Sequence, residues 1–212
     1  EADVIAFGGA LSACEKGRQW QMALGVLHEL LACQLDPNVI IYSSAISACE
    51  KGRQWQIALS LLDDMPQRGL TPNRITFNSA ISACEKSSEW SHALSLLRTM
   101  AEQRLAPDEV SYNAATSACE KGRRWQLAVQ LFEEMRCSEL VPDVIAYNAL
   151  VSACSVAQKW ELALLQLGSM RWHNVEPTVI SFNAALRACF VGDHWERVVQ
   201  LREDMCRSGL PP

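Results

Sequence analysis

The chain has 212 residues, 49% of them hydrophobic, and a formal net charge of −5 at pH 7. This composition is typical of a folded soluble protein and excludes a disordered tail. No apolar run reaches the roughly 18–20 residues that a bilayer-spanning helix needs, so we expect no transmembrane helix and no membrane partner.

One interval of 35 residues organises the whole chain. Tryptophan follows it at Trp20, Trp55, Trp90, Trp125, Trp160 and Trp195, and proline at Pro37, Pro72, Pro107, Pro142, Pro177 and Pro212. The interval divides the chain into six repeats, 4–38, 39–73, 74–108, 109–143, 144–178 and 179–212, the last lacking its final residue. Because a fixed period of this length is typical of a solenoid, we expect one continuous array.

Each repeat reads as two helices, as 39–73 illustrates. Its first half carries small or apolar side chains at the i, i+3, i+4, i+7 spacing of a helix, namely Tyr42, Ala45, Ile46 and Cys49. Gly52 then interrupts the pattern and is expected to supply the turn at low steric cost. A second helical stripe follows, namely Trp55, Ala58, Leu59, Leu62 and Met65, and Pro72 cannot continue it. No segment alternates as a strand does, so we predict an all-α fold, a right-handed superhelical α-solenoid of paired antiparallel helices.

Nine cysteines are present, and six of them follow the same interval: Cys14, Cys49, Cys84, Cys119, Cys154 and Cys189. Equivalent positions in stacked repeats lie roughly 9–10 Å apart, the spacing of packed helices. A disulfide needs Cα atoms closer than about 7 Å, so we predict buried free thiols. The tryptophans are expected to fill gaps between helices. No CxxC motif or paired histidine spacing indicates a zinc site.

The repeats are similar to those of the pentatricopeptide repeat family, as in RITFNSAISACEKSSEWSHALSLLRTMAEQRLAPD and EVSYNAATSACEKGRRWQLAVQLFEEMRCSELVPD. The matching features are an aromatic residue at the fourth position, Asn at the fifth, Lys at the thirteenth, Ala at the twentieth, Met at the twenty-seventh and a closing Pro-Asp. The tryptophan at the seventeenth position, where the family usually has an aliphatic residue, and the glutamate before the lysine depart from the pattern. The resemblance covers all six repeats.

That resemblance implies single-stranded RNA binding with one base per repeat. In the family, the fifth and last residues of each repeat read the base edge. Here those pairs are Gly8 with Asn38, Ser43 with Asn73, Asn78 with Asp108, Asn113 with Asp143, and Asn148 with Thr178, while Asn183 has no visible partner. The second residue sandwiches the bases, which implicates Ile5, Ile40, Ile75, Val110, Ile145 and Ile180.

The family code implies a preferred site of about 5′-(R)AUU(Y)(Y)-3′. Ser-Asn pairs favour adenine and Asn-Asp pairs favour uracil, so replacing Asn78 with Thr is expected to change the third base from U to G. Short polar side chains and stiff β-branched ones suit base recognition physically. The same residues can instead cap or back-bond helices and form turns, and the residues alone leave this alternative open.

A row of lysines at the thirteenth position is implied to face the RNA backbone, namely Lys16, Lys51, Lys86 and Lys121. A basic row can hide within an acidic total, because acidic residues such as Asp63 and Asp64 concentrate on the second helices. Glutamates adjoin the lysines and weaken the row, so we expect modest affinity and a shallow salt dependence.

Hydrolase, metalloprotease and nucleotide-binding motifs are missing from the sequence, so we expect neither catalysis nor a cofactor. The alternative function is a protein-binding scaffold of the tetratricopeptide kind. By the resemblance we expect a monomer that acts on transcripts in a mitochondrion or chloroplast. Further repeats or a C-terminal domain are compatible with the full-length protein.

Overall fold

A computed structural model describes residues 2–211, and all regular secondary structure in that range is helical. The first helices of the repeats are α1 (Ala2–Lys16), α3 (Val39–Lys51), α5 (Arg74–Lys86), α7 (Glu109–Lys121), α9 (Val144–Val156) and α11 (Val179–Val191). The second helices are α2 (Trp20–Ala32), α4 (Trp55–Gln67), α6 (Trp90–Glu102), α8 (Trp125–Cys137), α10 (Trp160–Trp172) and α12 (Trp195–Arg207). The predicted all-α solenoid of helix pairs is confirmed.

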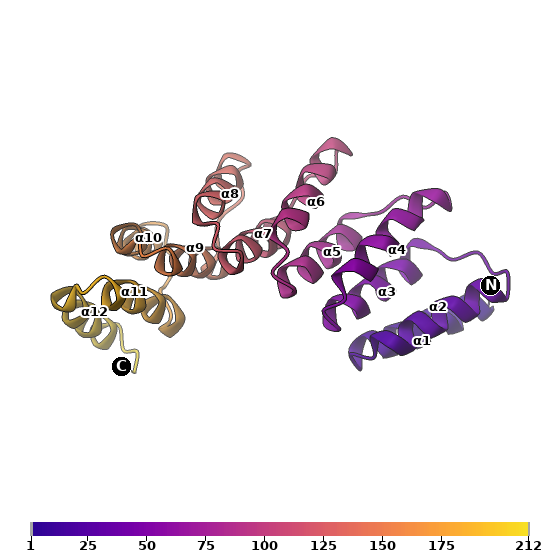
Figure 1. Ribbon diagram of the computed structural model, residues 1–212, viewed down its shortest axis with the longest axis horizontal. Coiled ribbons are helices and arrows are strands. Elements are labelled where there is room, and N and C mark those ends of the chain that lie inside the picture. The colour runs from indigo at the N-terminus through magenta and orange to yellow at the C-terminus, as the bar shows by residue number, and fades with distance from the viewer. Residues whose placement is uncertain (1, 212) are drawn as a thin grey trace. The chain divides into compact units, whose positions relative to one another are not determined.

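The chain forms two compact units, Glu1–Pro107 with α1 to α6 and Asp108–Pro212 with α7 to α12. Within each unit, every first helix packs against its own second helix and against the first helix of the next repeat (Figure 1). Neighbouring repeats therefore bury one another's apolar faces, as a helix pair too small to form its own core requires.

The core lies between the first and second helices of each repeat. The aromatic residue at the fourth position is fully buried in most repeats, as Tyr42, Phe77 and Tyr147 show. Small residues at the tenth and twentieth positions are buried in most repeats, as Ala48 and Ala58 show, and allow the helices to approach closely, whereas Ala13 in the first repeat is exposed.

All nine cysteines are free thiols, and the six that follow the interval are buried. Burial alone raises the pKa of Cys49, Cys119 and Cys154 to about 11 in each case. A thiol held neutral in this way behaves as a small apolar side chain, as the sequence predicted.

The turn inside each repeat does not depend on glycine in the way that we expected. Gly52 has an ordinary backbone with φ −83°, whereas the next residue, Arg53, adopts the left-handed conformation with φ 57°. A Cβ added to Gly52 would lie 2.3 Å from Cδ1 of Trp20 in the preceding repeat. Glycine is needed there because an indole ring packs directly against the backbone.

The tryptophans at the seventeenth position lie half-buried at the junctions between repeats. Trp55 packs on His92 with ring centroids 4.6 Å apart, and Trp160 packs on His194 at 4.0 Å. Each ring thus reaches the helix pair that follows its own. The expectation that tryptophan fills gaps between helices is confirmed, although Trp195 in the sixth repeat is exposed.

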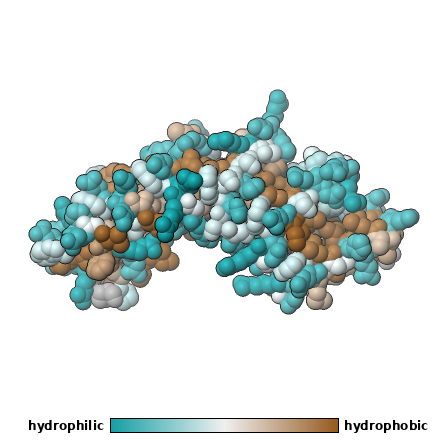
Figure 2. Space-filling view, in the orientation of Figure 1, coloured by the Kyte–Doolittle hydropathy of each residue, from teal (hydrophilic) through white to brown (hydrophobic). Residues whose placement is uncertain are grey.

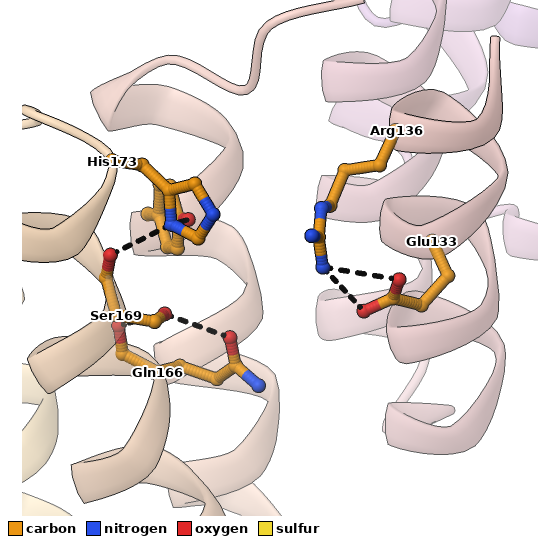
Figure 3. Close-up of polar contacts among 6 residues, drawn as sticks. Glu133, Arg136, Gln166, Ser169 and His173 are labelled. Atoms are coloured by element: carbon orange, nitrogen blue, oxygen red, sulfur yellow. Dashed lines mark hydrogen bonds and ion pairs between the residues drawn. The ribbon is translucent and has the colours of Figure 1, made fainter. Parts of the chain in front are cut away.

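The second helices carry many local polar contacts. Figure 3 shows Arg136 paired with Glu133 in α8, with Nη1 3.3 Å from Oε2. In α10 of the same view, Ser169 Oγ donates to the side-chain oxygen Oε1 of Gln166 at 3.3 Å. Such contacts within one helix are typical of a solvated face. No helix among residues 2–211 is both long and apolar enough to cross a membrane.

Asp64 differs from the other acidic residues of the second helices. It accepts a hydrogen bond from the Tyr42 hydroxyl and pairs with Arg68, whose Nε lies 2.6 Å away. The hydrogen bond from Tyr42 and the guanidinium together lower the pKa of Asp64. This carboxylate therefore ties the two helices of the second repeat together, a role that we did not expect for it.

Candidate functional site

An aliphatic side chain stands exposed near the start of every first helix. These residues are 55–75% exposed: Ile5, Ile40, Ile75, Val110, Ile145 and Ile180. Figure 2 shows hydrophobic residues reaching the surface of both units among hydrophilic ones. By helical periodicity, the second, fifth, ninth, twelfth and thirteenth positions share the side of the helix opposite the core. We call this side the first-helix face. Exposed aliphatic residues at one repeated position need an explanation other than packing within the chain.

In the fourth repeat, the fifth and last residues touch directly. Asn113 Nδ2 donates to Asp143 Oδ1 at 3.1 Å, although the two residues are 30 positions apart in sequence. The other amide atom, Asn113 Oδ1, is buried and has no hydrogen-bond partner among the described residues. The pair thus presents one satisfied contact and one acceptor without a partner.

In the second repeat, a hydroxyl from the next helix joins the fifth and last residues. Ser43 Oγ lies 2.8 Å from Thr76 Oγ1, and Thr76 Oγ1 donates to Asn73 Oδ1 at 2.9 Å. Because the single hydroxyl proton of Thr76 goes to Asn73, Ser43 is the donor in the first contact. The three residues form one chain of hydrogen bonds across the first-helix face.

The fifth repeat also links its fifth and last residues through a hydroxyl of the next helix, but with the opposite donor direction. Ser181 Oγ donates to Asn148 Oδ1 at 2.5 Å and lies 3.2 Å from Thr178 Oγ1. The sequence analysis missed the part played by Thr76 and Ser181, which occupy the third position of the following repeat. The available signal was a hydroxyl where other repeats have an apolar residue, such as Ala146.

The last-position residues also cap helices, which was the alternative left open. Asn38 Oδ1 accepts from the Ile41 amide at 3.0 Å, Asn73 Oδ1 from the Thr76 amide at 3.0 Å, and Asp143 Oδ1 from the Ala146 amide at 2.9 Å. Asp108 caps α7 in the same way. Capping engages one oxygen of each side chain, so it is compatible with a second role for the other polar atom.

Gly8, Asn78 and Asn183 are the predicted fifth-position residues outside these three pairs. Gly8 offers only backbone, and Asn183 is exposed. Asn78 is half-buried on α5, and its predicted partner Asp108 belongs to the other unit. The structure therefore brings together the pairs of the second, fourth and fifth repeats.

Two of the predicted backbone-binding lysines form ion pairs with the preceding repeat. Lys51 Nζ lies 2.9 Å from Glu15 Oε1, and Lys86 Nζ lies 2.6 Å from Glu50 Oε1. Ser47 Oγ donates to the same Glu15 oxygen at 2.8 Å. Lys16 and Lys121 are exposed. Contact of these four lysines with a ligand stays a prediction, and for Lys51 and Lys86 the positive charge is already matched.

The second unit has a different arrangement at the equivalent positions. Ser152 Oγ donates to Glu120 Oε1 at 2.5 Å, but Val156 stands where a lysine would follow. Arg187 donates to the hydroxyls of Ser152 and Ser155, at 3.1 Å in each case. This arginine is an exposed cation on the first-helix face. The sequence analysis missed it, although the other five repeats all have Ser at that position.

Among residues 4–211, His, Cys, Asp and Glu side chains form no group of three or more that could hold a metal ion. The first-helix face therefore offers apolar surfaces, short polar side chains and a few cations.

Known sequence families match several parts of this chain. A family described as the pentatricopeptide repeat domain matches residues 130–191, and one described as the PPR repeat family matches 37–86. The PPR repeat matches 75–105, 110–140 and 180–210. The chain belongs to the pentatricopeptide repeat family. No curated protein matches its sequence significantly.

Solved pentatricopeptide repeat structures share the fold. The chain is similar to the pentatricopeptide repeat protein PPR10 from maize, with 23% identity and a TM-score of 0.72 over 99% of this chain and 30% of that one. PPR10 in complex with an 18-nt psaJ RNA element is similar over 97% of this chain and 35% of that one, with 18% identity and a TM-score of 0.67.

The pentatricopeptide repeat domain of Arabidopsis thaliana protein-only RNase P 1, in complex with tRNA, is also similar. It has 15% identity and a TM-score of 0.69 over 79% of this chain and 88% of that one. At these identities the likeness concerns the fold. The chain spans less than a third of the length of the PPR10 chain.

Proposed function

We propose that this chain binds single-stranded RNA along the first-helix face, one base per repeat. The observation that carries the proposal is the meeting of the fifth and last side chains of a repeat beside an exposed aliphatic residue. Asn113 and Asp143 show it directly, and Ser43 with Asn73 shows it through Thr76. Residues 30 positions apart thus make one polar site in the second repeat and one in the fourth.

The spacing of the exposed aliphatic residues suits a base. Optimal carbon–carbon contacts are about 3.5–4.0 Å, so a flat ring held between two aliphatic groups separates them by about 7–8 Å. First helices that pack against one another are about 8–10 Å apart. Side chains such as Ile40 and Ile75, on successive repeats, can therefore contact the two faces of one base. Their β-branched shape limits the rotamer entropy lost on binding.

The polar pairs supply the selectivity. An Asn–Asp pair offers an amide and a carboxylate, which supply the short, directional donors and acceptors that can match the edge of a base. With the family code, the six repeats select about 5′-(R)AUU(Y)(Y)-3′. The scaffold function has no equivalent support, because a peptide does not require one polar pair per repeat.

The comparisons support the proposal through relatives that are bound to RNA. PPR10 was solved with a psaJ RNA element, and the PPR domain of protein-only RNase P 1 with tRNA. We propose that the target of this chain is likewise a transcript, in a mitochondrion or chloroplast, and that the described residues bind it without catalysing its cleavage.

A code change at one repeat tests the proposal. Asn113→Thr and the parent protein are titrated, by fluorescence anisotropy, with four RNA oligomers that differ only at the fourth base. The parent is expected to prefer U and the variant G, each by about tenfold, which is about 1.4 kcal/mol. Oligomers that differ at the second base are the internal control, because the Ser43 pair is unchanged. An unchanged preference at the fourth base contradicts the code. Binding to none of the oligomers favours the scaffold function.

A further inference from the structure

Two carboxylates on the first-helix face each hold a lysine of the next repeat. Glu15 pairs with Lys51 and Glu50 with Lys86, at 2.9 and 2.6 Å. The glutamates are more enclosed than the lysines: side-chain exposure is 25% and 17% for Glu15 and Glu50, against 29% and 35% for Lys51 and Lys86. All four side chains are partly exposed, and in the Glu50–Lys86 pair the glutamate is clearly the more enclosed partner.

Stability alone is a weak explanation for these ion pairs. Half-exposed pairs of this kind contribute about 0–1 kcal/mol, because solvent screens them and two long side chains lose freedom. Their effect on the potential of the surface is larger. A matched carboxylate cancels the attraction that an ammonium exerts on a phosphate beyond contact distance.

The pairs lie on the face that carries the proposed base-reading residues. The second and thirteenth positions of one helix are separated by 11 residues, or about 16 Å along the axis. A nucleic acid that follows the aliphatic side chains thus passes the ion pairs within a few turns. Acidic residues elsewhere, such as Glu133, instead pair with cations on their own second helix.

We propose that Glu15 and Glu50 set the selectivity of this face by restraining Lys51 and Lys86 from binding RNA phosphates. The inference rests on the proposed function. With the lysines neutralised, an RNA gains little from its backbone, and its bases decide whether it binds. Without the glutamates, any single strand gains phosphate contacts, and discrimination between sequences falls.

The size of the effect follows from counterion release. Each phosphate neutralised on a single strand adds about 0.7 to the slope of log K against log salt. When the salt concentration is lowered from about 1 M to about 0.1 M, each lysine that contacts a phosphate therefore raises the affinity roughly fivefold. Releasing both lysines is therefore expected to strengthen binding to a non-cognate strand by about 25-fold.

The test compares Glu15→Gln/Glu50→Gln with a control of equal charge change, Glu29→Gln/Glu102→Gln, on the exposed surface of α2 and α6. Glutamine keeps the size and hydrogen-bonding oxygen of glutamate, and circular dichroism melting shows whether each variant is folded. Binding is measured, over a range of salt concentrations, to the cognate RNA, to a scrambled RNA and to an abasic sugar-phosphate oligomer of the same length.

The proposal predicts that only the face variant gains affinity for the scrambled and abasic strands, with a slope steeper by about 1.4. Adding Lys51→Gln/Lys86→Gln to it is expected to remove the gain. Equal behaviour of the face variant and the control overturns the inference, whether or not the cognate RNA binds. If the parent shows no sequence preference, yet the face variant gains affinity for the abasic strand, the proposed function fails and the restraint by the glutamates stands.

Discussion

The two units solve the same packing problem with different chemistry. In Glu1–Pro107, successive first helices are joined by full ion pairs, as between Glu50 and Lys86. In Asp108–Pro212, the equivalent junction joins Arg187 to two serine hydroxyls, and a valine replaces the lysine. Apart from α1, which has 15 residues, every helix of both units has 13 residues, and the order of helices is the same. The backbone therefore tolerates either solution, and the choice decides where an unmatched positive charge remains.

The largest effect that we expect concerns the buried thiols, which differ between the units. Burial raises the pKa of Cys49 to about 11 and of Cys84 to about 12 in the first unit. In the second unit burial raises the pKa of Cys189 too, but the charge of Arg197 opposes the change. Unfolded thiols ionise near pH 8.5. Stability is thus complete below that pH and is lost as the pH rises toward the folded pKa values.

Urea unfolding at about pH 8 and about pH 10 measures this loss, which amounts to about 1.4 kcal/mol per pH unit for each thiol within the window. Cys49→Ala/Cys84→Ala is expected to reduce the alkaline loss more than Cys154→Ala/Cys189→Ala does. The exposed Cys33 provides the control, because Cys33→Ala removes a thiol that has no burial to lose. Equal effects of both pairs and the control contradict the comparison.

The second effect concerns the glycines that pack against a tryptophan of the preceding repeat, Gly52 and Gly192. Gly52→Ala places a methyl group 2.3 Å from Trp20, whereas at Gly192 the methyl group would lie 2.9 Å from Cδ2 of His194 and 3.3 Å from Cδ1 of Trp160. We expect Gly52→Ala to lower the free energy of unfolding by about 1–3 kcal/mol, as overpacking does, and Gly192→Ala to lower it less. Chemical denaturation measures both. Gly25→Ala, where nothing lies within 4 Å, is the matched control and should not destabilise the protein.

The third effect tests where unmatched charge meets RNA. Arg187→Gln is expected to weaken RNA binding by about fivefold at 0.1 M salt and to reduce the salt slope by about 0.7. Neutralising both ion pairs together, as Glu15→Gln/Glu50→Gln/Lys51→Gln/Lys86→Gln, removes the two lysine charges along with the carboxylates that match them, so it should change the affinity by less than about twofold. Salt titrations of RNA binding compare the two variants. A larger loss from the quadruple variant than from Arg187→Gln contradicts the comparison.

The smallest effect comes from introducing the glutamate–lysine ion pair of the first unit into the second unit. Val156→Lys puts an ammonium near Glu120, which now accepts a hydrogen bond from Ser152. We expect a gain of less than about 1 kcal/mol, as for other half-exposed ion pairs. A double-mutant cycle with Glu120→Gln isolates the pairwise energy. Zero coupling energy shows that the two side chains do not meet.

The helices and their buried faces could be predicted from the sequence, because periodicity and proline act within one repeat. Cys49 and Tyr42 lie where their spacing placed them. The turn was predicted less well, since Gly52 is required by the indole of Trp20 from another repeat. A contact between two repeats cannot be predicted from the residue spacing within either repeat.

For the candidate site, the exposed second positions could be predicted, but the contacts of the polar pairs could not. Thr76 and Ser181 belong to the first helix of the following repeat. They bridge the fifth and last residues of the preceding repeat only because that helix begins beside those two residues. The partners of Lys51 and Lys86 could not be predicted either. In the sequence each glutamate directly precedes the lysine of its own repeat, so the two were expected to interact. The structure instead pairs each lysine with the glutamate of the repeat before.

The most direct test of the central claim is selection of binding sites from a random RNA pool by the parent chain. One base per repeat predicts enrichment of a six-nucleotide motif centred on AUU. It also predicts that the same selection with Asn113→Thr moves the fourth base from U to G and leaves the others unchanged. No enrichment, or a motif that does not respond to the substitution, would contradict the account.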